Sequence, residues 1–164
     1  MAHAKPEVRI RPATVQDVPA ILGFIRELAE YEKLERELEV TEDLLRAHLF
    51  GPRPAAEVHI ASLACQDVGF AVFFTNFSTF VGRPGVFLED LYVQPHVRGQ
   101  GVGKALLREV ARLALERDCG RLEWAVLDWN EPSIGFYKGL GAVPMSDWTM
   151  YRLAGEALED LARR

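Results

Sequence analysis

The segment "GVFLEDLYVQPHVRGQGVGKALLREVARLA", residues 85–114, contains three different patterns in succession. Its first nine residues are rich in β-branched and aromatic side chains, which predicts a strand. Three glycines then follow at alternate positions, Gly99, Gly101 and Gly103. From Val102 to Arg117 apolar residues recur with the period of a helix that buries one face, namely Val102, Leu106, Leu107, Val110, Leu113 and Ala114. The segment therefore predicts a strand, a glycine-rich turn and an amphipathic helix.

The flanking sequence predicts further strands and helices in a definite order. Before this segment we expect a strand, two helices that begin after the N-cap residues Thr14 and Thr41, and a hairpin that turns at Gln66-Asp67. After it we expect a strand at 121–127, a short helix closed by Gly141, a strand at 148–153 and a polar helix. This order predicts one α/β domain spanning residues 1–164, with a mixed, mostly antiparallel twisted sheet of about six to seven strands flanked by helices.

Composition limits the classes of function. The chain has 164 residues, 49% of them hydrophobic, which suits a single core. A formal charge of −5 argues against nucleic-acid binding and is compatible with a cationic substrate. The N-terminus lacks a signal-peptide pattern, and no apolar run approaches the roughly 18 residues of a membrane span, so we expect a soluble cytoplasmic protein without a membrane partner. Two distant cysteines, Cys65 and Cys119, indicate reduced thiols, with neither a disulfide framework nor a zinc site.

The glycine-rich turn suits a pyrophosphate, because its backbone amides are unobstructed and lie at the positive end of the helix dipole. A Walker loop is excluded, since Arg98 stands where its first glycine would be and Ala105 follows Lys104. A dinucleotide-binding loop is excluded by the G-x-G-x-G spacing late in the chain. A glycine turn that binds nothing remains the alternative on these residues alone.

"RGQGVG", residues 98–103, matches the R/Q-x-x-G-x-G/A loop of the GNAT acetyltransferase superfamily. Five segments, "IRPAT", "LAEYEKLE", "LEDLYV", "RGQGVGKALL" and "WNEPSIGFYKGLGA", resemble the spermidine/spermine (diamine) acetyltransferase branch, and the similarity extends over nearly the whole chain. The resemblance implies acetyl transfer from acetyl-CoA to a primary amine of a small polyamine- or lysine-like substrate. It also implies a homodimer and requires no metal.

The reaction needs a proton acceptor and a proton donor. An alkylamine with a pKa of about 10.4 is neutral in only about 1 part in 2,500 at pH 7, so a base is useful. Glu89 and Asp90 interrupt an apolar strand, and alternation predicts that they point to opposite faces. The resemblance makes Glu89 the base, directly or through water, and Tyr137 the acid that protonates the departing thiolate. The alternatives are two exposed carboxylates and a core tyrosine.

The resemblance also implies two groups of binding residues. Those for acetyl-CoA are Leu91, Tyr92, Val93, Arg98, Gly99, Gln100, Gly101, Val102, Gly103, Lys104, Asn130, Glu131, Pro132, Ser133 and Tyr137. Those for the amine are Tyr31, Glu32 and Glu89, although a solvated acidic helix end would explain the first two equally well. The loops around residues 50–58 and 75–85 differ from those of polyamine enzymes, so a lysine-like amine such as thialysine is as credible as spermidine.

Two rival functions remain. The chain is also compatible with a GNAT enzyme that acetylates a peptide or protein amine, because the width of the acceptor groove cannot be read from sequence. A non-catalytic acyl-CoA-binding regulator would keep the glycine loop, but it would not need both Glu89 and Tyr137, which are present.

Overall fold

The computed structural model describes residues 7–164. Residues 1–6, part of the N-terminal stretch in which the sequence predicts no signal peptide, lie outside the described residues. The described chain divides into two compact units, one that ends at Ala125 and a second, Val126–Arg164. Each unit is described by itself below.

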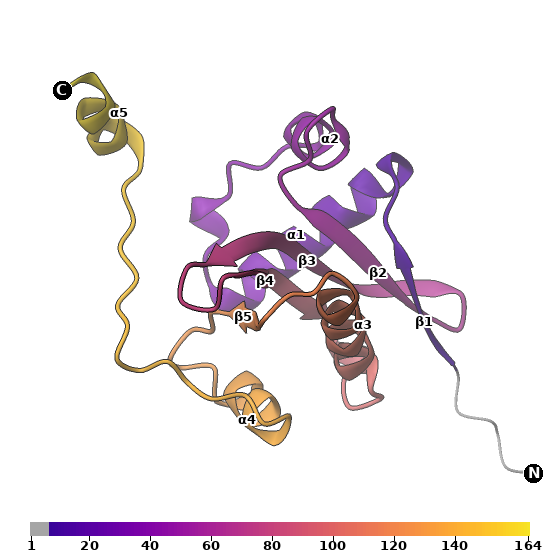
Figure 1. Cartoon of the computed structure of the whole chain (residues 1–164). Coiled ribbons are helices and arrows are strands. Elements are labelled where there is room, and N and C mark those ends of the chain that lie inside the picture. The colour runs from indigo at the N-terminus through magenta and orange to yellow at the C-terminus, as the bar shows by residue number, and fades with distance from the viewer. Residues whose placement is uncertain (1–6) are drawn as a thin grey trace, which may run out of the picture. The chain divides into compact units, whose positions relative to one another are not determined.

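The first unit is a sheet with helices on both faces (Figure 1). Its elements are β1 (Val8–Pro12), η1 (Val15–Asp17), α1 (Val18–Glu32), η2 (Glu35–Glu37), α2 (Glu42–Phe50), β2 (Glu57–Leu63), β3 (Gln66–Ser78), β4 (Arg83–Val93), η3 (Pro95–Val97), α3 (Val102–Glu116) and β5 (Leu122–Trp124). The strands follow the order β1-β2-β3-β4-β5, and only the β4–β5 pair is parallel. The predicted α/β class and mostly antiparallel sheet are confirmed, with five strands among residues 7–164 where about six to seven were expected.

The second unit contains α4 (Glu131–Gly139) and α5 (Gly155–Arg163). The prediction of a strand at 148–153 is wrong, because no strand occurs in this unit's described residues. Alternating residues extend the chain, but a strand also requires a neighbouring strand to complete its backbone hydrogen bonds.

Local hydrogen bonds explain where several elements begin and end. The predicted cap Thr14 forms a capping box with Asp17, whose Oδ2 accepts from the Thr14 backbone nitrogen at 2.7 Å. Thr41 caps α2 by accepting from the Leu44 nitrogen at 3.2 Å. The β2–β3 turn lies at Ala64-Cys65 and not at Gln66-Asp67, since both residues adopt the left-handed conformation that tight hairpins require.

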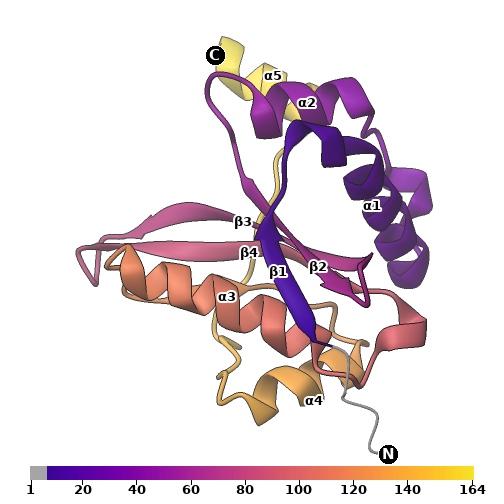
Figure 2. The same ribbon diagram turned by 90° about the vertical axis from the view of Figure 1, so that its right-hand side faces the viewer.

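The core lies on both faces of the sheet. Helix α1 and helix α2 cover one face, and α3 crosses the other (Figure 2). The cluster on the α1 side consists of Val18, Ile21, Leu22, Phe24, Leu45, Val58, Ile60, Phe70, Val72 and Tyr92. The predicted apolar stripe of α3 is confirmed, because its buried residues are Val102, Leu106, Leu107, Val110 and Ala114. The sheet and α3 therefore hold the glycine turn between two packed elements.

Candidate active site

Strand β4 has one backbone edge that is only partly paired. On its β3 side, pairing continues to Val93. On its other side, β5 pairs only with Val86, Phe87 and Leu88 and then ends at Trp124. The described pairings therefore leave the edge of residues 89–93 without a strand partner, as expected for a strand that separates from its neighbour. This edge includes Leu91, Tyr92 and Val93, three of the predicted acetyl-CoA contacts.

A β-bulge in β4 changes the placement of its two carboxylates. Asp90 pairs with Val72, whereas Leu88 pairs with Phe73, the next residue of β3. Glu89 is thus an additional residue between two consecutive pairs. Because Val72 belongs to the core cluster under α1, Asp90 lies on the α1 face and Leu88 on the opposite one. Strict alternation would place Leu88 and Asp90 on the same face, so the bulge interrupts the alternation at Glu89. The opposite orientation of Glu89 and Asp90 stays a prediction.

The surroundings of Asp90 favour its protonated form. Burial raises the pKa of the Asp90 carboxyl to about 7, and the negative charges of Glu89 and Glu32 add to the effect. Burial also raises the pKa of Glu32, which ends α1 together with Tyr31. On the α1 face of the sheet, Glu32 therefore lies near Asp90 of β4, whose carboxyl has a pKa near neutral pH. Glu89 itself is exposed.

The glycine turn has the geometry of an anion cradle. Gly99 (φ 76°) and Gly101 (φ 89°) adopt the left-handed conformation, which side chains disfavour, and no atom lies within 4 Å of where their Cβ atoms would be. Gly101 is the N-cap of α3, which has 15 residues. Gly103 would meet only a Val93 methyl group, at 3.7 Å. The turn thus presents open backbone at a long helix N-terminus, which fits the pyrophosphate of acetyl-CoA.

The predicted acid Tyr137 lies on α4 in the second unit. Asn130, which is buried, accepts from the Ser133 nitrogen at 3.4 Å and so caps this helix. Pro132 occupies its first turn, as expected. The ring of Tyr137, which is partly buried, lies 5.4 Å from that of Phe136, measured between centroids. The N-cap of this helix is therefore Asn130.

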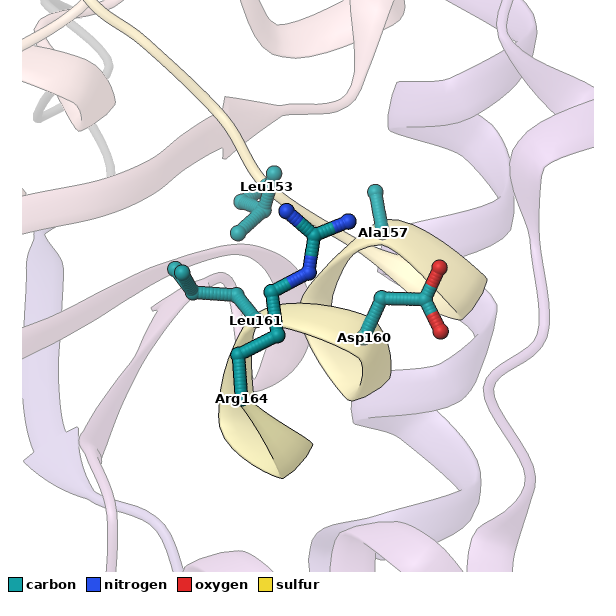
Figure 3. Close-up of a pocket in the computed structure, with 5 residues that line it drawn as sticks. All are labelled: Leu153, Ala157, Asp160, Leu161 and Arg164. Carbon is teal, nitrogen blue, oxygen red and sulfur yellow. The ribbon is translucent and has the colours of Figure 1, made fainter.

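A hollow in the second unit does not form part of this site. A shallow hollow beside α5 is lined by Leu153, Ala157, Asp160, Leu161 and Arg164 (Figure 3). It belongs to one helix and the segment before it.

Among residues 7–164, no three or more His, Cys, Asp or Glu side chains are grouped so that they would hold a metal ion. No helix in the described part of the chain combines the length and hydropathy that crossing a membrane requires.

Sequence reasoning missed two features of this site. It treated Asp90 as a carboxylate away from the acceptor residues, because a bulge leaves no mark in an alternating pattern. It also gave no role to Glu27 of α1, which accepts a hydrogen bond from Gln94 Nε2 at 3.2 Å. The only available signal for Asp90 was a charged residue inside an apolar strand.

The glycine turn at the start of α3 and the unpaired edge of β4 fit the class of acyl-CoA-dependent enzymes that the sequence resemblance implies. Residues 22–142 match the family model described as "Acetyltransferase (GNAT) family". The chain belongs to the GNAT acetyltransferase family.

Several named relatives match most of this chain. It is 40% identical to thialysine N-epsilon-acetyltransferase of Bos taurus over 94% of this chain and 97% of the relative. It is 31% identical to an L-ornithine N5-acetyltransferase of Arabidopsis thaliana, over 92% and 86%. It is 33% identical to the human spermidine/spermine N(1)-acetyltransferase-like protein 1 over 94% of this chain, but only 24% of that longer protein.

The fold recurs in a solved structure of a Vibrio cholerae integron cassette protein. The two chains are 26% identical and superimpose with a TM-score of 0.80, covering 96% of this chain and 98% of the other. This similarity supports the GNAT fold of the chain.

Proposed function

We propose that this acetyltransferase moves an acetyl group from acetyl-CoA to the side-chain amine of a small lysine-like molecule, with polyamines as the related alternative. The observation that carries the proposal is the pair of carboxyl groups on the α1 face, Glu32 and Asp90, beside the unpaired edge of β4. A cationic amine is attracted by such carboxyl groups. Two of the relatives are named for acetylation of amines of this class, thialysine and ornithine.

Acetyl-CoA supplies the acetyl group as a thioester, and this chain's residues hold it. The amides of Gly99 to Gly103 bind the pyrophosphate at the start of α3, where the helix dipole favours an anion. Leu91, Tyr92 and Val93 lie on the unpaired backbone edge of β4 and would hold the pantetheine arm by backbone hydrogen bonds. The resemblance also assigns residues 130–133 of the second unit to acetyl-CoA binding.

The Glu89–Asp90 pair removes the proton that blocks the amine. Glu89 is exposed and takes the proton through a water molecule, as the resemblance implies. Asp90, with a pKa of about 7, titrates in the range where a general base works best at neutral pH. The proton acceptor therefore lies at these two successive carboxyl groups of β4.

Tyr137 supplies the proton that the departing thiolate needs. A phenol with a pKa of about 10 keeps its proton at neutral pH and can give it to a thiolate whose thiol has a pKa of about 8.5. The transfer is slightly uphill in water, so hydrogen bonding in the site must favour it. The charge that would otherwise develop on sulfur is thereby neutralised.

The deciding experiment measures CoA release by the purified protein with thialysine, lysine, ornithine, putrescine, spermidine, spermine and a short peptide. We expect the highest kcat/KM for a lysine-like amine, and Tyr137→Phe should lower kcat at least about tenfold. Tyr151→Phe is the matched control, because this exposed tyrosine lies outside the proposed site. A preference for the peptide would favour a protein acceptor. Binding of CoA without turnover of any amine would favour a non-catalytic binding protein.

The proposed enzyme is a homodimer. Support comes from the resemblance and from large apolar side chains that are exposed within the units, Phe80 at 93% and Trp148 at 71%. Light scattering of the eluting protein from a size-exclusion column should give twice the mass of 18.4 kDa. A monomer at micromolar concentration would contradict the proposal.

A further inference from the structure

Arg98, the first residue of the glycine motif, directs its side chain back to β4. Its Nε donates to the backbone oxygen of Val93 at 2.8 Å, which joins the end of the strand to the start of the turn. A hydrogen bond from a charged donor is stronger than a neutral one. At least one donor of Arg98 is therefore engaged in holding the turn in place.

The same guanidinium also joins β4 to α1. Its central carbon lies 4.8 Å from the ring centroid of Tyr31 and 5.6 Å from that of Tyr92. Both distances are within the range of a favourable cation–π contact. Tyr31 belongs to the last turn of α1 and directly precedes Glu32. One side chain of the cosubstrate turn thus contacts the helix end that carries the proposed amine-binding residues.

A second bridge lies one helical turn earlier on α1. The carboxylate of Glu27 accepts from Gln94 Nε2 at 3.2 Å, and Gln94 directly follows β4. The carboxylate of Glu27 also acts on the phenol of Tyr92, a residue that is 4% exposed. Burial and this carboxylate together raise the pKa of Tyr92 to about 12. Because Glu27 and Tyr31 are four residues apart, both bridges leave the same face of α1.

We propose that Arg98 is a positioning residue that couples the acetyl-CoA turn to the amine-binding end of α1 through Tyr31. The identification of that helix end as the acceptor side rests on the proposed function, whereas the contact itself does not. Bound acetyl-CoA holds the backbone of residues 98–103 in one conformation and thereby holds the Arg98 side chain in place. Arg98 in turn restricts the position of the Tyr31 ring. Coupling between two sites is reciprocal, so an altered Tyr31 changes CoA affinity as well.

The test is a double-mutant cycle on CoA affinity, measured by titration calorimetry of the purified full chain. Tyr31→Leu should weaken CoA binding about two- to fivefold, the range expected for the loss of an exposed cation–π contact. This effect is expected even though Tyr31 lies on α1 and not in the glycine turn. Tyr31→Phe keeps the ring and should retain the parent affinity. In an Arg98→Ala background, Tyr31→Leu should have no further effect, because the coupling partner is absent.

The variant Arg98→Lys tests whether the positive charge alone maintains CoA affinity or whether the guanidinium geometry is needed. Lysine keeps the positive charge but lacks the planar guanidinium and its Nε–H, so it should reproduce most of the loss caused by Arg98→Ala. Full rescue by lysine would overturn the assignment, since charge alone would then suffice. Equal effects of Tyr31→Leu in the parent and Arg98→Ala backgrounds would overturn it too. Thermal melting of every variant checks that the fold is intact.

A kinetic measurement separates this inference from the proposed function. With acetyl-CoA saturating, Arg98→Ala should raise the KM for the best amine more than it lowers kcat, because the residue acts on Tyr31 and not on the reacting atoms. An unchanged amine KM would overturn the coupling while leaving acetyl transfer established. Absence of both CoA binding and turnover in the parent protein would overturn both proposals.

Discussion

Arg11 holds Asp17 in a two-pronged ion pair, with Nη1 2.8 Å from Oδ2 and Nη2 2.9 Å from Oδ1. The guanidinium is the main reason that the pKa of Asp17 is lowered to about 2, and hydrogen bonds from Thr14 add to it. This pair joins β1 to the segment that opens α1. It therefore anchors the first strand to the helix that carries the proposed acceptor residues.

Replacing Asp17 should destabilise the protein in a pH-dependent manner. The folded pKa of Asp17 is about 2, below the unfolded value, so its carboxylate contributes stability at pH 7 that is lost as pH falls from about 4 to about 2. Asp17→Asn should lower the free energy of unfolding at pH 7 by about 1–2 kcal/mol. Urea unfolding at pH 7 and pH 3 measures this.

The control for Asp17 is Asp43→Asn, since Asp43 pairs with Arg46 at 97% side-chain exposure. An exposed pair of this kind should change stability by less than about 0.5 kcal/mol. If the two variants behaved alike at pH 7, the pair with Arg11 would not be an anchor.

The pH dependence of activity should report Asp90. A base must be deprotonated, so kcat/KM should rise with pH through the pKa of about 7 of Asp90. The variant Glu32→Gln removes a negative charge that raises this pKa, so the rising limb should move to lower pH without disappearing. Rates measured from pH 5.5 to 9 test this.

Glu37→Gln is the matched control for Glu32→Gln, because Glu37 is an exposed glutamate of η2 in the same acidic stretch. The kcat/KM of Glu37→Gln should rise over the same pH range as that of the parent protein. A limb that stayed in place in Glu32→Gln would show that Asp90 is not the group that titrates.

Asp90 should also limit stability at high pH. Its folded pKa of about 7 exceeds the unfolded value, so the folded state is penalised by its ionisation and stability falls as pH rises from about 4 to about 7. Asp90→Asn should therefore raise the free energy of unfolding at pH 8 by about 1–3 kcal/mol while it lowers activity. Denaturant unfolding at pH 5 and pH 8 measures it, and an equal gain at both would contradict the mechanism.

A methyl group in the glycine turn should impair cosubstrate binding. Gly101 has φ 89°, which an alanine adopts only with strain, so Gly101→Ala should cost about 1–2 kcal/mol in stability and weaken CoA binding at least about tenfold. Gly23→Ala is the control, because Gly23 lies inside α1 with nothing within 4 Å of its would-be Cβ. It should leave CoA affinity unchanged and raise stability by up to about 1 kcal/mol.

Local chemistry in the sequence was enough to predict much of the molecule. The capping pattern at Thr14 and Thr41, the apolar stripe of α3 and the glycines before it depend on neighbouring residues only, so they can be read without tertiary contacts. The expected strand at 148–153 was wrong for the complementary reason, because a strand needs a partner that local alternation does not reveal.

The sequence by itself determined the family, through the glycine turn and the segment around Tyr137, and with it the expectation of acetyl transfer. Only the tertiary structure decided the placement of Asp90, because a bulge arises from the pairing of β3 with β4 and shifts every later side chain to the other face. The contact between the Arg98 guanidinium and the Tyr31 ring is likewise visible only in the tertiary structure. That contact depends on how α1 packs on the sheet, and the packing is set by the whole core.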